Sequence, residues 1–270
     1  MKRILTALVL MAALWVVIKR TDPIVFFGLI ALGIAVAAWE CYRILDASGA
    51  RALRALGIAS SVAIAWSFLG RSPSFDATLP LTAATALACV LAMGRREGPE
   101  AMLRSAAATL VPVLLVGLGL SYLVGLRALP GEDGEDPLVL LGVCVILSDT
   151  AALYVGRSIG TRRLAPVLSP KKTWEGAVGG ILASVLGGLL AHVWFYQRLP
   201  IPHAVALGLV LGVAGIAGDL AESAIKRAGG VKDSSALLPG HGGILDRADS
   251  LLIAAPVLYY YHRAFLEGLK

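Results

Sequence analysis

Long apolar runs separated by short polar segments dominate this chain. Several runs approach the roughly 20 residues that a helix needs to cross a bilayer, and they are continuous rather than alternating. The pattern predicts an all-α, polytopic integral membrane protein with about nine transmembrane helices. The predicted spans are Ile4–Ile18, Ile24–Trp39, Leu56–Leu69, Leu79–Met93, Ala106–Leu126, Leu138–Val155, Ala177–Tyr196, Ala204–Ala217 and Leu251–Tyr261.

The first run follows Met1-Lys2-Arg3, as the apolar core of a signal peptide does. No small-residue cleavage site precedes Lys19-Arg20, so we expect a retained helix. The chain shows no internal repeat, low-complexity tract or soluble linker. We therefore predict one membrane domain over residues 1–270, with an N-terminal helical array at 1–146 and a catalytic part at 147–270.

Composition supports a membrane protein. Of the 270 residues, 57% are hydrophobic and only 16% are charged, against about 25% charged in a soluble domain. The net charge of +6 does not require nucleic acid as a partner, because basic residues gather on the cytoplasmic loops of membrane proteins. The cysteines Cys41, Cys89 and Cys144 lie in or beside apolar runs without metal-site spacing, so we interpret them as small buried hydrophobes.

The distribution of basic residues also predicts the orientation. With nine spans and a cytoplasmic N-terminus, most of the 24 Lys and Arg residues fall on cytoplasmic segments, while the acidic loop Pro130–Pro137 lies outside. This bias predicts a multi-pass protein of the inner (plasma) membrane with an external C-terminus. It places the segment SPKKTWEG (Ser169–Gly176) and the polar window Gly218–Ser250 together on the cytoplasmic side.

Two carboxylates lie within or at the end of apolar runs, and a charge inside a span costs roughly 2.5–3.5 kcal/mol on insertion scales. Asp149 lies within the sixth predicted span and is a candidate functional residue, although a position at a frayed, hydrated helix end would also explain it. Glu40 ends the second span. It could face the interior of the bundle, but we favour the interpretation that it only marks the membrane interface.

The polar window Gly218–Ser250 concentrates charges and glycines in a chain that otherwise avoids charge. If the eighth helix continues past Ala217, its polar residues share one face by their i, i+3, i+4, i+7 and i+8 spacing. These residues are Asp219, Glu222, Ser223, Lys226 and Arg227. A solvated amphipathic face would give the same spacing, but this stripe grows directly out of an apolar span.

The segment DRAD (Asp246–Asp249) opens the ninth span and places two carboxylates at i, i+3 if it is helical. Together with Asp219, these two carboxylates can converge on a hard cation. Magnesium prefers carboxylate oxygens and shares phosphate ligands, whereas zinc would require Cys or His ligands. We therefore predict a magnesium site with Asp219, Asp246 and Asp249 as ligands.

Between these two helix ends lies a glycine-rich loop with several cations, but no GxxxxGK[ST] motif. Lys226, Arg227, Lys232 and Arg247 can bind a polyphosphate, and His241 can serve as a general base or as a structural or phosphate-binding residue. A phosphate nucleophile is already ionised and needs no base. The residues alone therefore predict a metal-assisted phosphoryl or nucleotidyl transfer with a lipid as one substrate.

The window also resembles a known signature. Ser223-Ala-Ile-Lys226-Arg227, then Lys232-Asp233, then Leu238-Pro239-Gly-His241-Gly-Gly-Ile-Leu-Asp246-Arg247-Ala248-Asp249 is similar to that of phosphatidate cytidylyltransferases (CDP-diacylglycerol synthases). SPKKTWEG and SDTAALYVGRSIG resemble two further markers of that family. Ala248 departs from the larger apolar residue that is usual there. The resemblance is strong from Leu147 to Ser250, and the N-terminal half matches only as a helical array.

The resemblance implies that CTP and phosphatidate react to give CDP-diacylglycerol and pyrophosphate for phospholipid biosynthesis. It implies a magnesium centre with potassium beside it, and a homodimer in the lipid bilayer. By matching position, it implies that Asp219, Asp246 and Asp249 hold metal and that Asp149 aids metal or nucleotide binding. The phosphate contacts that it implies are Ser169, Lys171, Lys172, Ser223, Lys226, Arg227, Lys232 and Arg247.

Two other hypotheses remain open. A transporter or channel would also carry intramembrane charges, but it is expected to show broken helices paired in two halves. A related cytidylyltransferase could act on an ether-linked or isoprenoid lipid phosphate. Pyrophosphate release with each lipid phosphate would distinguish these possibilities.

Overall fold

The computed structural model describes residue 17 and residues 21–70, 74–94, 98–129, 134–237 and 242–267. Almost all regular structure in this part is helical, as the apolar pattern predicts. The helices are α2 (Pro23–Ala47), α3 (Arg54–Ser67), α4 (Thr78–Met93), α5 (Pro99–Pro112), α6 (Gly119–Arg127), α7 (Glu135–Ile159), α8 (Trp174–Trp194), α9 (Ile201–Ala228), α10 (Leu245–Ala248) and α11 (Leu251–Tyr261), with π-helical segments η1 (Val113–Leu118) and η3 (His262–Leu266). The first predicted span falls outside the described residues except for its position 17.

Five helical stretches in the described part are long and apolar enough to cross a membrane. They are Pro23–Ala47, Pro99–Arg127, Glu135–Ile159, Trp174–Trp194 and Ile201–Ala228. Each contains all or nearly all of one span predicted from the sequence. The protein is therefore a helical, multi-pass membrane protein, which is the predicted class.

The longest of these stretches contains a proline, as predicted. Pro112 ends α5, and η1 follows it before the α-helical pattern resumes at Gly119. Proline has no N–H to donate to the preceding turn, and a π-helical segment is one way to rearrange the local hydrogen bonds. The three elements therefore form one helical rod of 29 residues.

The segment between α7 and α8 differs from the loop that we expected. It forms an antiparallel hairpin of β1 (Arg163–Ala165) and β2 (Ser169–Thr173). The Thr173 side chain accepts a hydrogen bond from the N–H of Gly176 and so caps α8. Glu175 accepts hydrogen bonds from Thr161 and Arg162, which fixes the base of the hairpin on α8. The strands are short and mostly polar, so they give no alternating apolar signal, and the sequence pattern missed this hairpin.

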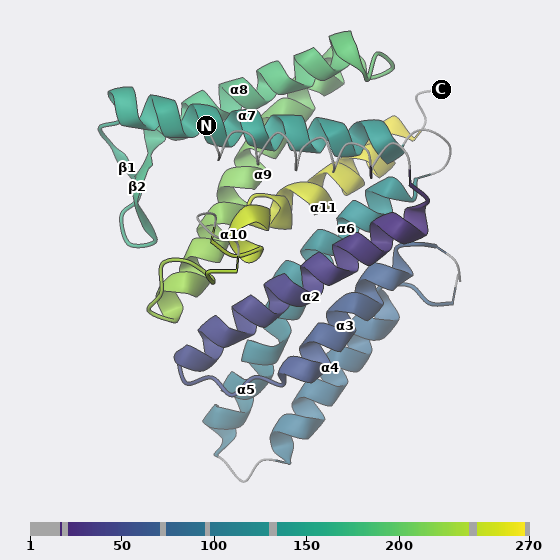
Figure 1. The fold of residues 1–270 in the computed structure, drawn as a ribbon, viewed down its shortest axis with the longest axis vertical. Helices are drawn as coiled ribbons and strands as arrows, with labels where there is room; N and C mark the ends of the chain where they lie inside the picture. The colour runs from purple at the N-terminus through teal and green to yellow at the C-terminus, as the bar shows by residue number, and fades with distance from the viewer. Residues whose placement is uncertain are drawn as a thin grey trace.

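Small residues set the packing of the C-terminal helices. Figure 1 shows α7 and α8 lying side by side across one end of the molecule, with α9 and α11 running from there toward the α2–α6 group. A Cβ at Gly208 would lie 2.4 Å from the Cα of Val185, and one at Gly188 would lie 2.3 Å from the carbonyl oxygen of Ala204. Glycine at these positions lets α8 and α9 approach closely, as membrane helices often do.

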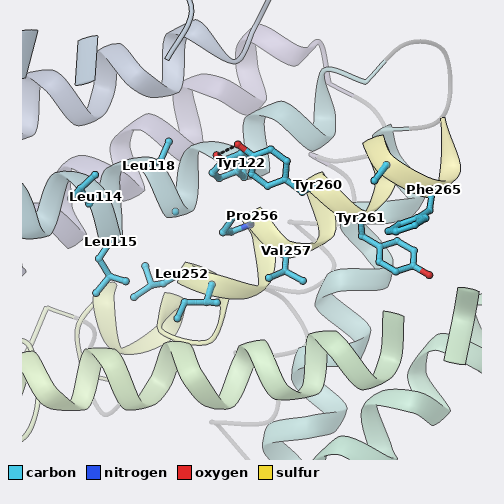
Figure 2. A pocket seen from close by; sticks show the side chains of 13 residues that line it. Leu114, Leu115, Leu118, Tyr122, Leu252, Pro256, Val257, Tyr260, Tyr261 and Phe265 are labelled. Atoms are coloured by element: carbon cyan, nitrogen blue, oxygen red, sulfur yellow. Dashed lines mark hydrogen bonds between the residues drawn. The ribbon is translucent and has the colours of Figure 1, made fainter. Parts of the chain in front are cut away.

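An apolar groove of about 680 Å³ runs between the η1–α6 rod and the α11–η3 rod. Figure 2 shows Leu114, Leu115 and Leu252 at one end of this groove and Tyr261 and Phe265 at the other. Tyr122 and Tyr260 share a hydroxyl–hydroxyl hydrogen bond of 2.8 Å along its side. The groove begins three residues after Asp249, so an apolar surface adjoins the polar window.

Candidate active site

The C-terminal half of α9 carries the polar stripe that the sequence predicts. The helix continues to Ala228, so Asp219, Glu222, Ser223 and Lys226 share one face. Glu222 is completely buried, and Lys226 lies beside it with 2.6 Å between Nζ and Oε2 of the glutamate. The Ser223 hydroxyl donates to Asp219 Oδ1 at 3.3 Å. These four residues therefore form an internal polar surface, not a solvated amphipathic face, whereas Arg227 at the end of the stripe is exposed.

Three carboxylates converge where α9 meets the turn between α10 and α11. Oxygen atoms of Asp219, Glu222 and Asp249 all lie within 4.8 Å of one another. Gly218 permits this approach, because a Cβ there would lie 2.4 Å from the carbonyl oxygen of Asp249. Burial, together with the nearby charge of Asp219, raises the pKa of Asp249 to about 7. We call these three residues the carboxylate cluster.

Asp246 is helical and three residues from Asp249, as expected, but its carboxylate is engaged elsewhere. Its Oδ1 accepts a hydrogen bond from Lys226 at 2.7 Å, and its Oδ2 accepts from the N–H groups of Gly243 at 2.8 Å and Ser234 at 2.9 Å. Burial disfavours its ionised form, but these donors outweigh burial and lower the pKa of Asp246 below its usual range. Lys226 thus connects Asp246 to Glu222, a member of the carboxylate cluster.

The hairpin contributes a cation to the same site. Lys172 on β2 places its Nζ 2.5 Å from Asp219 Oδ2. Ser169 and Lys171 lie on the same strand, and Lys171 is exposed. The segments SPKKTWEG and α9, which are far apart in the sequence, therefore meet at the carboxylate cluster.

Asp149 lies on α7 beside the start of α11. The hydroxyl of Ser250 donates to its Oδ2 at 3.3 Å. Ser250 follows Asp249 directly, so Asp149 reaches the edge of the cluster through this serine. Position 149 lies ten residues before the end of α7, which contradicts the alternative of a frayed helix end.

Glu40 does not merely mark the membrane interface, so our interpretation of this residue was wrong. It is completely buried and accepts hydrogen bonds from the polar window. The donors are Ser234 Oγ at 3.2 Å, Ser235 Oγ at 2.5 Å, Ile244 N at 3.2 Å and Leu245 N at 2.8 Å. Because loop donors satisfy this carboxylate, it tolerates burial that an unpaired charge would not.

The remaining predicted phosphate ligands lie around this site. The Arg227 guanidinium donates to the carbonyl oxygens of Leu168, on the hairpin, and Val231, after α9. Lys232 and Arg247 are exposed. His241 lies outside the described residues. The sequence analysis placed Glu222 on the polar stripe but not among the metal ligands. It left Glu40, at the end of an apolar run, out of the site, and Ser234 gave no signal of its own.

The carboxylate cluster has the chemistry of a site for a hard cation. Its ligands are all oxygens, and Glu222 Oε1 is buried with no hydrogen-bond partner among the described residues. An orphaned buried carboxylate oxygen is costly unless a cation or proton meets it. Asp219, Glu222 and Asp249 therefore fit magnesium, which prefers carboxylate oxygens.

Fold and site together define a multi-pass helical protein with a carboxylate–lysine centre at the junction of α9, α11 and a basic hairpin. A family model described as "Cytidylyltransferase family" matches residues 1–265, and the chain belongs to this family.

Several curated proteins with related sequences are named phosphatidate cytidylyltransferase. A phosphatidate cytidylyltransferase of Brucella suis is 46% identical over 147 residues, which are 53% of this chain and 54% of the relative. One of Staphylococcus epidermidis is 42% identical over 153 residues, 57% of each chain. An uncharacterised Escherichia coli protein, YnbB, is 39% identical over 168 residues, 61% of this chain and 56% of the relative. The matched stretch thus spans about half the length of each relative.

Proposed function

We propose that this protein transfers the cytidylyl group of CTP to phosphatidate, giving CDP-diacylglycerol and pyrophosphate. The observation that carries the proposal is the carboxylate cluster with Lys172 and Lys226 paired to its members. Acidic groups that can hold a cation, next to ammonium groups that can bind phosphates, are what nucleotidyl transfer requires. The family and the names of the relatives support the same reaction.

Asp219, Glu222 and Asp249 would hold magnesium. When bound, the ion supplies charge stabilisation for the phosphates of CTP. The sequence predicted Asp246 as a ligand in place of Glu222. In our proposal Asp246 instead holds Lys226, since its oxygens already accept from Lys226, Ser234 and Gly243. A potassium ion beside magnesium remains a prediction from the family resemblance.

In the proposed reaction, an ionised phosphate oxygen of phosphatidate attacks the α-phosphorus of CTP. A new P–O bond forms, the bond to the β-phosphate oxygen breaks, and pyrophosphate leaves with the electron pair. The nucleophile carries no proton, so no general base is needed. Lys172 pairs with Asp219, and Lys226 pairs with Glu222. A cation held by these two carboxylates would weaken both pairs, so that both ammonium groups could also bind phosphate oxygens while Asp246 keeps Lys226 in place.

The acyl chains of the lipid need an apolar surface next to the carboxylate cluster, and we propose that one chain lies in the groove of Figure 2. Asp249, Leu252, Pro256 and Tyr260 follow a helical spacing along one side of α11, so the groove continues the face that carries the cluster. From Leu252 to Phe265 a helix rises roughly 20 Å, which is enough for one leaflet of a bilayer core of about 30 Å.

We also propose the finer features predicted from the sequence: nine spans, a cytoplasmic N-terminus, residence in the inner (plasma) membrane and an active site on the cytoplasmic side. Basic residues at the hairpin and at the end of α9 support this orientation. A reporter enzyme that is active only outside the cytoplasm, fused after Lys270, should be active. The homodimer is likewise a proposal, to be tested by the mass of the detergent-solubilised protein.

The reaction itself is tested by pyrophosphate release from purified protein given CTP, magnesium and dioleoyl phosphatidate. Release with this lipid supports the proposal. Release only with an ether-linked or isoprenoid lipid phosphate would assign the related cytidylyltransferase activity instead. No release with any lipid phosphate would favour a transporter.

A further inference from the structure

Glu40 is distant in sequence from every other member of the site, yet it contacts the loop that joins α9 to α10. It lies on α2, a helix apolar enough to span a membrane, and its side chain is completely buried. Burying a carboxylate on such a helix costs free energy, so a residue of this kind is a functional candidate. All four donors that meet it in the described part of the chain are neutral and belong to the polar window.

These donors come from both ends of one loop. Ser234 and Ser235 lie a few residues after α9, whereas Ile244 and Leu245 open α10. One carboxylate on α2 therefore closes the loop between them and satisfies two N–H groups at the start of α10, which have no partner within that helix. Asp246 follows Leu245 directly, so its backbone position depends on this anchor.

Ser234 links Glu40 to the site through its side chain. Its Oγ lies 3.2 Å from Glu40 Oε2 and 2.8 Å from Asp246 Oδ2. A hydroxyl has one proton, so it donates to one of these carboxylates at a time. From Asp246 the contacts continue through Lys226 to Glu222, a member of the carboxylate cluster. Glu40 thus begins a chain of polar contacts that ends at the proposed metal site.

Packing at Gly243 is an independent sign that this contact is closely fitted. A Cβ at this position would lie 2.0 Å from Ser234 Oγ and 2.5 Å from Glu40 Oε1. Real side chains do not pack at such distances, so a larger residue at 243 would force the Ser234 or Glu40 side chain to move from its observed position. At the other end of the loop, a Cβ at Gly229 would lie 2.6 Å from the carbonyl oxygen of Ile44, also on α2.

We infer that Glu40 is a positioning residue of the active site: through it α2 anchors the loop between α9 and α10, and Ser234 links Glu40 to Asp246 and Lys226. This inference rests on the proposed cytidylyl transfer. It gives the N-terminal helical array a part in the site beyond forming membrane spans. Glu40 itself touches neither the carboxylate cluster nor Lys226 in any contact of the described residues.

The test compares Glu40→Gln, Glu40→Ala and Glu40→Asp in the full-length protein, with Asp46→Asn as the matched control. Asp46 is on the same helix and pairs with Arg54, away from the loop. Glutamine presents N–H groups to donors, so we expect Glu40→Gln and Glu40→Ala to lower kcat roughly tenfold or more. Glu40→Asp keeps the charge and should recover part of this loss, whereas Asp46→Asn should stay within about twofold of the original kcat.

Three further measurements separate positioning from general destabilisation. Amide exchange should accelerate in residues 242–250 of Glu40→Gln but not in α8. The losses caused by Glu40→Gln and Ser234→Ala should not add, because both act along one path. The KM for CTP should change less than kcat. The inference is wrong if Glu40→Gln keeps the kcat of the unsubstituted protein and its amides in residues 242–250 exchange no faster. It is also wrong if exchange accelerates throughout the molecule.

A failure of the proposed reaction can be told apart from a failure of the proposed role of Glu40. If the unsubstituted protein releases no pyrophosphate from CTP and phosphatidate, the proposed reaction is wrong. The exchange measurement still decides whether Glu40 anchors the loop, because it requires no turnover. Unchanged exchange in Glu40→Gln would then refute the anchor by itself.

Discussion

Lys172 Nζ lies 2.5 Å from Asp219 Oδ2, so a strand of the basic hairpin contacts α9 at the carboxylate cluster. Both side chains are about one-quarter exposed, 24% for the lysine and 28% for the aspartate. A pair this accessible contributes little to stability. Its importance therefore lies in placing an ammonium group where phosphates would bind.

Replacing this lysine should impair activity more than stability. We expect Lys172→Met to lower kcat/KM for CTP by roughly 100-fold, because one charge-assisted phosphate contact is lost. The Tm should change by only a few degrees. Steady-state kinetics and thermal unfolding in detergent measure the two effects. Arg163→Ala, an exposed change on β1, is the control and should behave like the original protein; equal losses in both variants would implicate the hairpin fold instead.

Metal binding should depend on Asp219 and Asp249. Magnesium that binds only the folded protein raises Tm as its concentration increases. We expect this rise in the original protein and in Asp46→Asn, and a much smaller rise in Asp219→Asn and Asp249→Asn. Both cluster variants should also need more magnesium for half-maximal pyrophosphate release. An unchanged magnesium response in both would remove these aspartates from the metal site.

Asp246→Asn should abolish turnover while the protein still inserts into the membrane. The substitution removes the charge that holds Lys226 and places an amide where the Gly243 and Ser234 N–H groups donate. The loss of a buried charged partner costs about 3–5 kcal/mol, so Tm should fall as well. The magnesium-dependent shift in Tm should persist, because Asp246 lies outside the carboxylate cluster; its loss would restore Asp246 as a metal ligand.

How much of the fold and the site could be predicted depends on the signal that each residue gives in the sequence. Apolar length predicted eight of the helical segments now described, and helical spacing placed Asp219 and Lys226 on one face. Spacing alone could not determine that Asp246 turns toward Ser234 while Asp249 turns toward Asp219, since loop contacts decide that difference. Glu40 was misjudged because a carboxylate at the end of an apolar run looks the same whether water or a distant loop satisfies it.

A substitution at Gly243 tests whether the close packing of the loop against Glu40 is needed, without changing any charge. Gly243→Ala adds one methyl group that would meet Ser234 Oγ and Glu40. Overpacking of this kind costs about 1–3 kcal/mol, and kcat should fall together with Tm. Gly28→Ala on α2 is the matched control, because a Cβ there meets nothing within 4 Å. A Gly243→Ala variant with original Tm and kcat would show that the loop adjusts freely.

Filling the apolar groove should raise the KM for a long-chain phosphatidate more than the KM for a short-chain one. Ala264→Trp places a bulky ring in the groove, whereas Leu182→Trp alters an exposed position on α8. We expect Ala264→Trp to raise the KM for dioleoyl phosphatidate about tenfold, because a methylene contributes roughly 0.8 kcal/mol when buried and only a few need be displaced. The KM for a short-chain, dispersed phosphatidate and for CTP should stay within twofold of the control. A parallel loss with short and long chains would exclude an acyl chain from the groove, and a change from dimer to monomer would place a second copy of the protein there.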